Sequence, residues 1–156
     1  MITRVQLQAA QERAARMLAS IGINITATER QNIEVAEFGL GELEQTCTEH
    51  RHPPSAGNPG KMETFCCRWG SVVLFIKGDQ TQYLQCKPPV GSEAYYTVFH
   101  EIAVSPGDQY TIPPDTLHWF QAGPEGAIVS EFSSASHDES DVFTDPGIRR
   151  IPEISD

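Results

Sequence analysis

The chain has 156 residues, of which 39% are hydrophobic and 21% are charged, and this is typical of one soluble globular domain. The formal net charge of −10 argues against nucleic acid and anionic membranes as partners, but it does not exclude a neutral ligand such as a sugar. The charged N-terminal stretch and the lack of a long apolar run predict neither a signal peptide nor a membrane span. The four cysteines have no CxxC spacing, so we expect reduced thiols and a cytoplasmic protein.

One amphipathic helix is predicted near the N-terminus, over residues 5–21. Thr3 and Gln6 form a capping-box pattern at its start, and Gly22 supplies a stop. The apolar positions recur at helical spacing and are Leu7, Ala10, Ala14, Leu18 and Ile21.

After this helix, the sequence consists of short runs rich in β-branched and aromatic residues, separated by Gly/Pro turn signals. This pattern is typical of a β-barrel or a β-sandwich in a single domain. The tail after Ser136 is polar, and we expect it to run over the surface. The predicted strands are residues 33–38, 64–69, 72–77, 81–86, 96–104, 109–112, 117–122 and 127–133.

Two histidines and a glutamate flank the Pro/Gly-rich segment PPSAGNPG. His50 and His52 are two residues apart, so a strand would place both imidazoles on one face. The segment that follows can reverse the chain and return Glu63 on a neighbouring strand, opposite the histidines. Taken alone, an HxH pair is more commonly a pair of solvated surface histidines, and a lone Glu63 is more commonly a surface residue.

His118 is the best candidate for a third imidazole, because it follows a Pro-Pro corner at the start of a predicted strand. Three imidazoles and one carboxylate leave two positions open on a six-coordinate ion. Such a ligand set suits Mn²⁺, Fe²⁺ or Co²⁺, or Zn²⁺ in a catalytic site.

These residues resemble the two motifs of the cupin family, a fold of mainly β structure built as a double-stranded β-helix, or jelly-roll barrel. The run from Glu63 to Gly70 matches the second half of the first motif, and Gly107-DQYTI-Pro113 with His118 matches the second motif. The sequence departs from the family in three ways. The gap between His52 and Glu63 is long, Asp115 replaces the turn glycine, and no glycine precedes His50.

A closer resemblance is to the cupin-type D-lyxose isomerases. It rests on HRH, GKMETF, RWG, TIPPDTLHWFQAGPEGAIVSEFS and DVFTDP, and it extends from about residue 16 to the C-terminus. The resemblance implies a single cupin domain over residues 1–156, with a helix at about 4–21, a barrel at about 30–135 and a polar tail. It also implies a Mn²⁺-activated homodimer that interconverts D-lyxose and D-xylulose, often with D-mannose and D-fructose as a second pair.

Aldose–ketose isomerisation through a metal-bound cis-enediolate needs a base at carbon and a proton donor for the oxygens. Glu131 lies in an apolar strand with Val129 and Ser133 on the same face, and a carboxylate there is explained either by a general base or by a salt bridge on the barrel face. Lys61 would share the inward face with Glu63, and a nearby cation would lower its pKa; its alternative is a surface lysine. The resemblance implies proton-handling roles for a lysine and a glutamate, so Glu131 is the predicted base and Lys61 its partner acid.

Two other functions fit the same ligands. Fe²⁺ on three histidines and a glutamate also serves a cupin dioxygenase, and a sugar-binding cupin needs no catalysis. Asp141, Asp145 and Arg149 either form a salt-bridged flap, bind distal hydroxyls, or belong to a solvated tail. Trp119 alternates with the histidine before it, so we expect it to point away from the metal.

Overall fold

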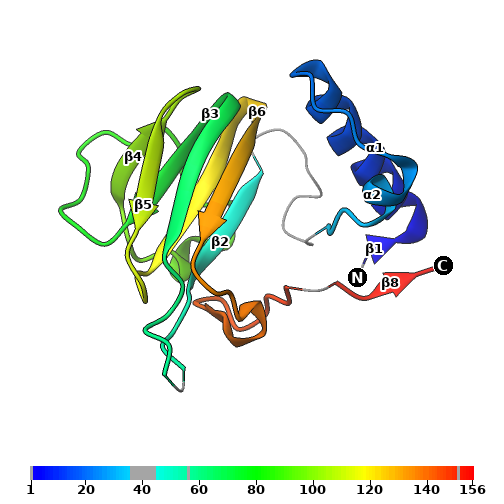
Figure 1. Cartoon of the computed structure of the whole chain (residues 1–156). Coiled ribbons are helices and arrows are strands. Elements are labelled where there is room, and N and C mark those ends of the chain that lie inside the picture. The colour runs from blue at the N-terminus through cyan, green and yellow to red at the C-terminus, as the bar shows by residue number, and fades with distance from the viewer. Residues whose placement is uncertain (1, 36–44, 56, 151) are drawn as a thin grey trace.

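The computed structural model describes residues 2–35, 45–55, 57–150 and 152–156 (Figure 1). It is mainly antiparallel β structure with one long helix, as predicted for a cupin. No helix in these ranges is long and apolar enough to cross a membrane. The helices are α1 (Arg4–Ser20) and α2 (Ala27–Gln31), with short 3-10 helices at Glu93–Tyr95 and Asp138–Ser140; the strands are β1 (Ile2–Thr3), β2 (Thr46–Arg51), β3 (Glu63–Ile76), β4 (His100–Val104), β5 (Gln109–Ile112), β6 (His118–Ser133), β7 (Val142–Phe143) and β8 (Ile154–Ser155).

Helix α1 begins as predicted, because the Thr3 side chain accepts from the Gln6 backbone and the Gln6 side chain accepts from the Thr3 backbone. The helix covers little core: its buried residues are Ala10 and Gln11. The Gln11 amide donates to the backbone oxygens of Gln31 and Ile33, and these contacts tie α1 to the end of α2.

The predicted strands differ from the observed ones mainly at their joins. Residues 64–69 and 72–77 form one strand, β3, and residues 117–122 and 127–133 form one strand, β6. The glycines between these runs bend a strand instead of reversing the chain. The strand predicted at 81–86 is wrong, residues 33–35 form no strand, and residues 36–38 lie outside the described part of the chain. The strand predicted at 96–104 begins only at His100.

The main sheet has the order β4-β3-β6-β2-β7, and β5 pairs with β3. The β3·β6 ladder extends from Glu63 opposite Ser133 to Ile76 opposite His118, with register shifts between residues 67 and 72. Glu63 and His118 therefore stand at opposite ends of one ladder.

The ladder bends along its length, and its register shifts lie next to Gly70. A flat ladder would separate Glu63 from His118 by roughly 40 Å, yet a Glu63 carboxylate oxygen lies 3.3 Å from His118 Nε2. Gly70 has φ +73°, and an added Cβ would lie 2.0 Å from the Gly126 carbonyl oxygen. Glycine is thus required at this close crossing of β3 and β6, where the sheet curls into a barrel.

Apolar side chains pack on both sides of the sheet. One cluster holds Phe65, Leu74, Ile76 and Ile112. On the opposite side, Trp119 stacks on Phe75 with ring centroids 3.9 Å apart and donates to the Val98 carbonyl at 2.8 Å. Trp119 is fully buried there, on the face opposite to that of its neighbour His118, as predicted.

The C-terminal segment was predicted to run over the surface, and its described residues are exposed or partly exposed, but parts of it also pair with other strands. Phe143 in β7 pairs with His50 in β2, so the segment extends the sheet. At its end, β8 pairs in parallel with β1, and Asp156 forms an ion pair with Arg4. Figure 1 shows both termini beside the helices, on one side of the barrel.

Candidate active site

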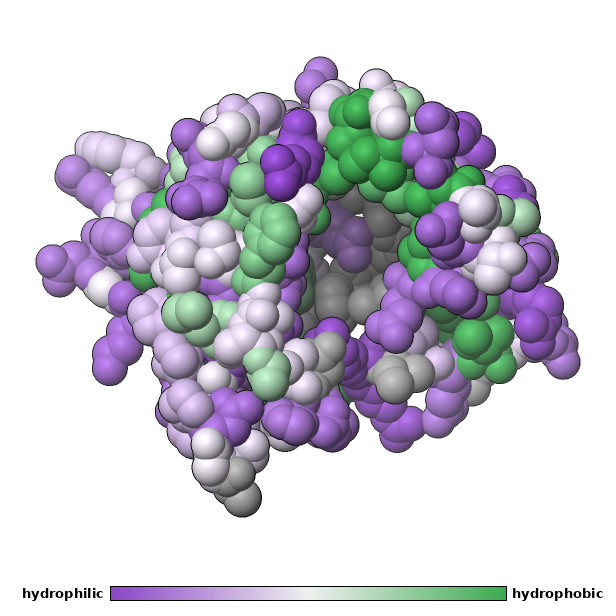
Figure 2. Space-filling model, viewed as in Figure 1, coloured by the Kyte–Doolittle hydropathy of each residue, from purple (hydrophilic) through white to green (hydrophobic). Residues whose placement is uncertain are grey.

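A cavity of about 520 Å³ lies between the barrel and the segments at the two ends of the chain, and Figure 2 shows the molecule hollowed there. The barrel side carries the predicted site residues, and the other side mixes apolar with polar side chains. The barrel contributes Cys47, His50, His52, Lys61, Glu63, Phe65, His118, Phe120 and Glu131; the N-terminal segment contributes Ile2, Leu7, Gln11 and residues 31–35; the C-terminal segment contributes Arg150, Pro152 and Ile154.

Three buried imidazoles meet at the inner end of this cavity. His50 in β2 stands directly opposite His118 in β6, and their ring centroids are 4.3 Å apart. His52 follows just after β2. One ligand atom from each of the three residues lies within 4.8 Å of the others. The structure therefore brings the predicted histidines together in a group that could hold a metal ion.

In His50 and His118, the ring nitrogen Nδ1, here called the outer nitrogen, is hydrogen-bonded to a backbone carbonyl. His50 Nδ1 lies 2.7 Å from the Thr48 carbonyl oxygen, and His118 Nδ1 lies 2.9 Å from the Thr116 carbonyl oxygen. A carbonyl oxygen only accepts hydrogen bonds, so each Nδ1 carries a proton that points to it, and in a neutral ring this leaves the lone pair on Nε2. Burial, reinforced by His118, lowers the pKa of His50 to about 3, so this ring is neutral and able to ligate.

Glu63 joins the same group from the start of β3. Its two carboxylate oxygens lie 3.1 Å from His52 Nε2 and 3.3 Å from His118 Nε2. These two nitrogens and Glu63 Oε2 are buried without a hydrogen-bond partner among the described residues. Buried polar atoms without partners are costly, and three of them around one point fit the ligand set of a divalent cation.

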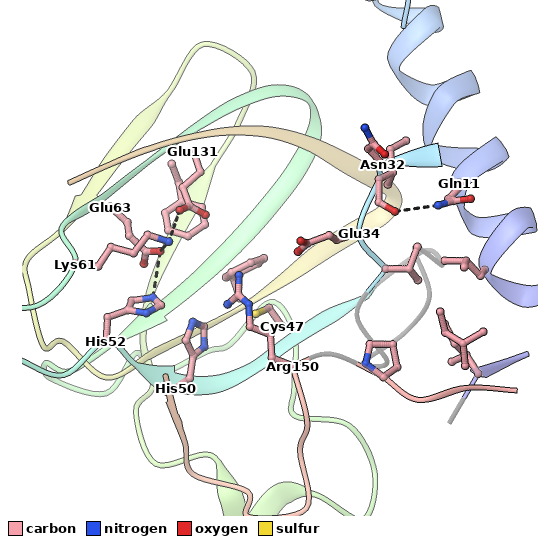
Figure 3. A pocket seen from close by; sticks show the side chains of 18 of the residues that line it. Gln11, Asn32, Glu34, Cys47, His50, His52, Lys61, Glu63, Glu131 and Arg150 are labelled. Atoms are coloured by element: carbon pink, nitrogen blue, oxygen red, sulfur yellow. Dashed lines mark hydrogen bonds and ion pairs between the residues drawn. The ribbon is translucent and has the colours of Figure 1, made fainter. Parts of the chain in front are cut away.

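Lys61 links Glu63 to Glu131. Its ammonium nitrogen lies 2.7 Å from a carboxylate oxygen of each (Figure 3). The sequence predicts that a nearby cation lowers the pKa of Lys61, whereas the protein groups by themselves act in the opposite direction. Burial does act to lower the pKa, but hydrogen bonds to Glu131 and Glu63 outweigh it and raise the pKa.

Glu131 stands opposite Phe65 in the β3·β6 ladder. Its side chain is 39% exposed and opens to the cavity, while Glu63 is 3% exposed. Burial and the nearby Glu63 charge raise the pKa of Glu131, although Lys61 opposes the shift. The two carboxyl groups therefore differ: burial would also raise the pKa of Glu63, but contacts with His118, His52 and Lys61 hold that pKa well below its usual range.

Relatives of known activity share most of this sequence, although no family model matches the chain. It is 53% identical to the D-lyxose/D-mannose isomerase of Thermosediminibacter oceani, with 100% of both chains covered. It is 52% identical to the D-lyxose ketol-isomerase of Cohnella laeviribosi, with 93% of both covered. The chain belongs to the D-lyxose isomerase family. It is therefore an enzyme of the ketol-isomerase class.

Solved structures resemble this D-lyxose isomerase family member in fold. The L-ribose isomerase of Cellulomonas parahominis in its L-psicose complex superposes with a TM-score of 0.71 at 14% identity, covering 99% of both chains. That of Acinetobacter sp. DL28 with L-ribose gives 0.73 at 15% identity, covering 99% of this chain and 98% of that one. At this identity, the likeness supports the cupin-type fold alone.

The sequence predicted only some of the C-terminal residues that contribute to the site. Of the three candidates, Asp141 reaches the histidines, because its carboxylate lies 2.5 Å from His52 Nδ1. Asp145 accepts from a backbone amide instead, and Arg149 forms a surface ion pair with Glu153. Arg150 lines the cavity and was missed, because two adjacent arginines in a polar tail give no sign of which one turns inward.

Proposed function

We propose that the chain interconverts D-lyxose and D-xylulose, with D-mannose and D-fructose as a second pair. The reaction uses a divalent metal ion, with Mn²⁺ as the first candidate. Three histidines and one glutamate hold this ion: His50, His52, His118 and Glu63. The enzyme is a single cupin domain, acts as a homodimer and works in the cytoplasm. The names of the curated relatives support the substrate assignment.

One observation carries the chemical part of this proposal. The partnerless ligand atoms of His52, His118 and Glu63 lie in the same cavity as the Lys61–Glu131 pair. A group that could bind a cation thus lies beside a titratable pair. A purely sugar-binding cupin would need no such pair, and nothing in the geometry favours an oxygenase.

The reaction moves a proton between C1 and C2 of the open-chain sugar and another between O1 and O2. When bound, a divalent cation supplies Lewis acidity that polarises the carbonyl oxygen. Glu131 takes the carbon-bound proton and returns it to the neighbouring carbon, as its exposure to the cavity and raised pKa favour. Lys61, between Glu131 and Glu63, serves the oxygens and balances the two carboxylate charges.

The proposal is tested by adding Mn²⁺ to metal-stripped protein and following ketose formation from a panel of aldopentoses and aldohexoses. We expect D-lyxose to react fastest and the stripped protein to be inactive. In deuterated water, transfer through Glu131 should introduce deuterium into the product. Activity without metal, or no ketose from any aldose, would contradict the proposal.

The role of Glu131 is tested with Glu131→Gln, which keeps the size of the side chain but cannot accept the proton. Turnover should fall by ~10² or more while Mn²⁺ affinity is retained, because the residue is no ligand. Glu125→Gln, an exposed change on the same strand, is the matched control. Unchanged turnover in Glu131→Gln would remove this residue from the mechanism.

A further inference from the structure

Asp141 uses its two carboxylate oxygens for two different parts of the site. Its side chain is only 2% exposed. Oδ1 lies 2.5 Å from His52 Nδ1, and Oδ2 lies 2.6 Å from Arg150 Nη1. The carboxylate therefore lies behind a candidate ligand ring and also holds a cation that lines the cavity.

Among the three imidazoles, only His52 has a side chain as the hydrogen-bond partner of its outer nitrogen. His50 and His118 use backbone carbonyls two residues before them in the chain. Those two contacts are local, because each joins residues two apart in the chain. The partner of His52 is Asp141, which lies 89 residues further along the chain. The orientation of the His52 ring thus depends on the C-terminal segment being in place. A carboxylate at this position also fixes the tautomer and makes the opposite nitrogen a better ligand.

Arg150 is the second partner of the Asp141 carboxylate. Its side chain is 38% exposed and lines the cavity together with His50 and His52 (Figure 3). The contact with Asp141 crosses nine residues of chain and fixes where the guanidinium stands. Because Asp141 is buried, its charge needs this cation as well as the imidazole N–H.

We propose that Asp141 is a positioning residue that couples the two binding functions of the site: it orients His52 toward the metal ion and holds Arg150 in the wall that receives the hydroxyl groups of the sugar. This inference rests on the proposed function and adds to it that one carboxylate from the C-terminal segment sets both metal affinity and sugar affinity.

The test compares Asp141→Asn with Arg150→Gln. Binding of Mn²⁺ to the metal-stripped proteins is measured by calorimetry without sugar. Asp141→Asn should weaken Mn²⁺ binding by about 10- to 100-fold, the usual cost of losing an outer partner of a ligating histidine. Arg150→Gln should keep Mn²⁺ affinity close to that of the wild type. Both variants should raise KM for D-lyxose at saturating Mn²⁺. The change in kcat should be smaller in Arg150→Gln than in Asp141→Asn.

Matched controls come from the same segment. Asp145→Asn and Arg149→Gln remove one carboxylate and one guanidinium that do not line the cavity, and both should behave as the wild type. Asp141→Ser removes the carboxylate without burying an amide, and it serves as a second variant if Asp141→Asn fails to fold.

Two results would overturn the inference: wild-type Mn²⁺ affinity in the folded Asp141 variants, or a wild-type KM in Arg150→Gln. A wild-type protein that binds Mn²⁺ but converts no aldose would instead contradict the proposed function. The comparison of Mn²⁺ affinities would still decide the role of Asp141, because that measurement needs no turnover.

Discussion

Asp115 stands where the cupin motif has its turn glycine, and the structure explains how the exchange is tolerated. Its φ is +55°, in the left-handed region that glycine enters freely. Aspartate is among the few other residues that enter this region. Its carboxylate also forms an ion pair with Arg51, next to His52. The departure seen in the sequence therefore preserves the turn that leads to His118.

At the residue scale, protonation of His52 should make the free energy of unfolding depend on pH. Burial acts to lower its pKa, but the contacts with the Asp141 and Glu63 carboxylates outweigh this effect and raise the pKa from 6.5 to about 9 for the protein groups alone. Since the folded state holds this proton more tightly than the unfolded state, the contribution to stability is full below pH 6.5. It is lost as the pH rises through about 9.

We therefore expect the free energy of unfolding of metal-stripped protein to fall more between pH 6.5 and 9.5 in the wild type than in His52→Gln. Urea titrations in the presence of a chelator measure both. An equal fall in the two proteins would show that the proton on His52 makes no contribution.

At the scale of the element, the two longest strands depend on one glycine crossing. In Gly70→Ala, the new Cβ would meet the Gly126 carbonyl oxygen at 2.0 Å, and no side-chain rotation can relieve a contact with backbone. We expect a loss of more than ~2 kcal/mol in the free energy of unfolding. Mn²⁺ affinity should fall as well, because this crossing brings Glu63 to His118.

The control is Gly107→Ala. Gly107 also has positive φ, +95°, but nothing lies within 4 Å of the added Cβ. This variant should show only the conformational strain, about 1–2 kcal/mol, and normal Mn²⁺ affinity. Equal losses in both variants would mean that the crossing at Gly70 is not specially tight.

At the scale of the molecule, the ends of the chain build the outer wall of the cavity. Strands β1 and β8 pair with each other, and Ile2, Pro152 and Ile154 face the cavity across from the histidines. The candidate ligands all come from the barrel. The outer wall and the candidate metal ligands thus come from different parts of the chain. A change in the wall should therefore affect KM without affecting Mn²⁺ affinity.

A chain that ends at Pro152 should show a several-fold higher KM for D-lyxose with unchanged Mn²⁺ affinity, because it loses β8 and part of the wall. Arg4→Gln is the control: it removes the exposed ion pair with Asp156, and such pairs contribute little. An unchanged KM after truncation, or a loss of Mn²⁺ binding, would contradict this division.

The sequence by itself determined the features that depend on neighbours along the chain. These are helix α1 with its cap, the alternation that turns Trp119 away from His118, and the identity of the family. Such features follow from backbone preference and from the periodicity of side chains. The sequence also suggested that His50, His52 and His118 belong together, because their spacing matches a motif.

Only the tertiary structure decided how distant segments meet. Runs that read as separate strands join into β3 and β6, since a glycine can bend a strand as well as end it. The contact of Asp141 with His52 and the choice of Arg150 over Arg149 both depend on the return of the C-terminal segment to the barrel. No local pattern reports these contacts, because they are fixed by packing between residues far apart in the chain.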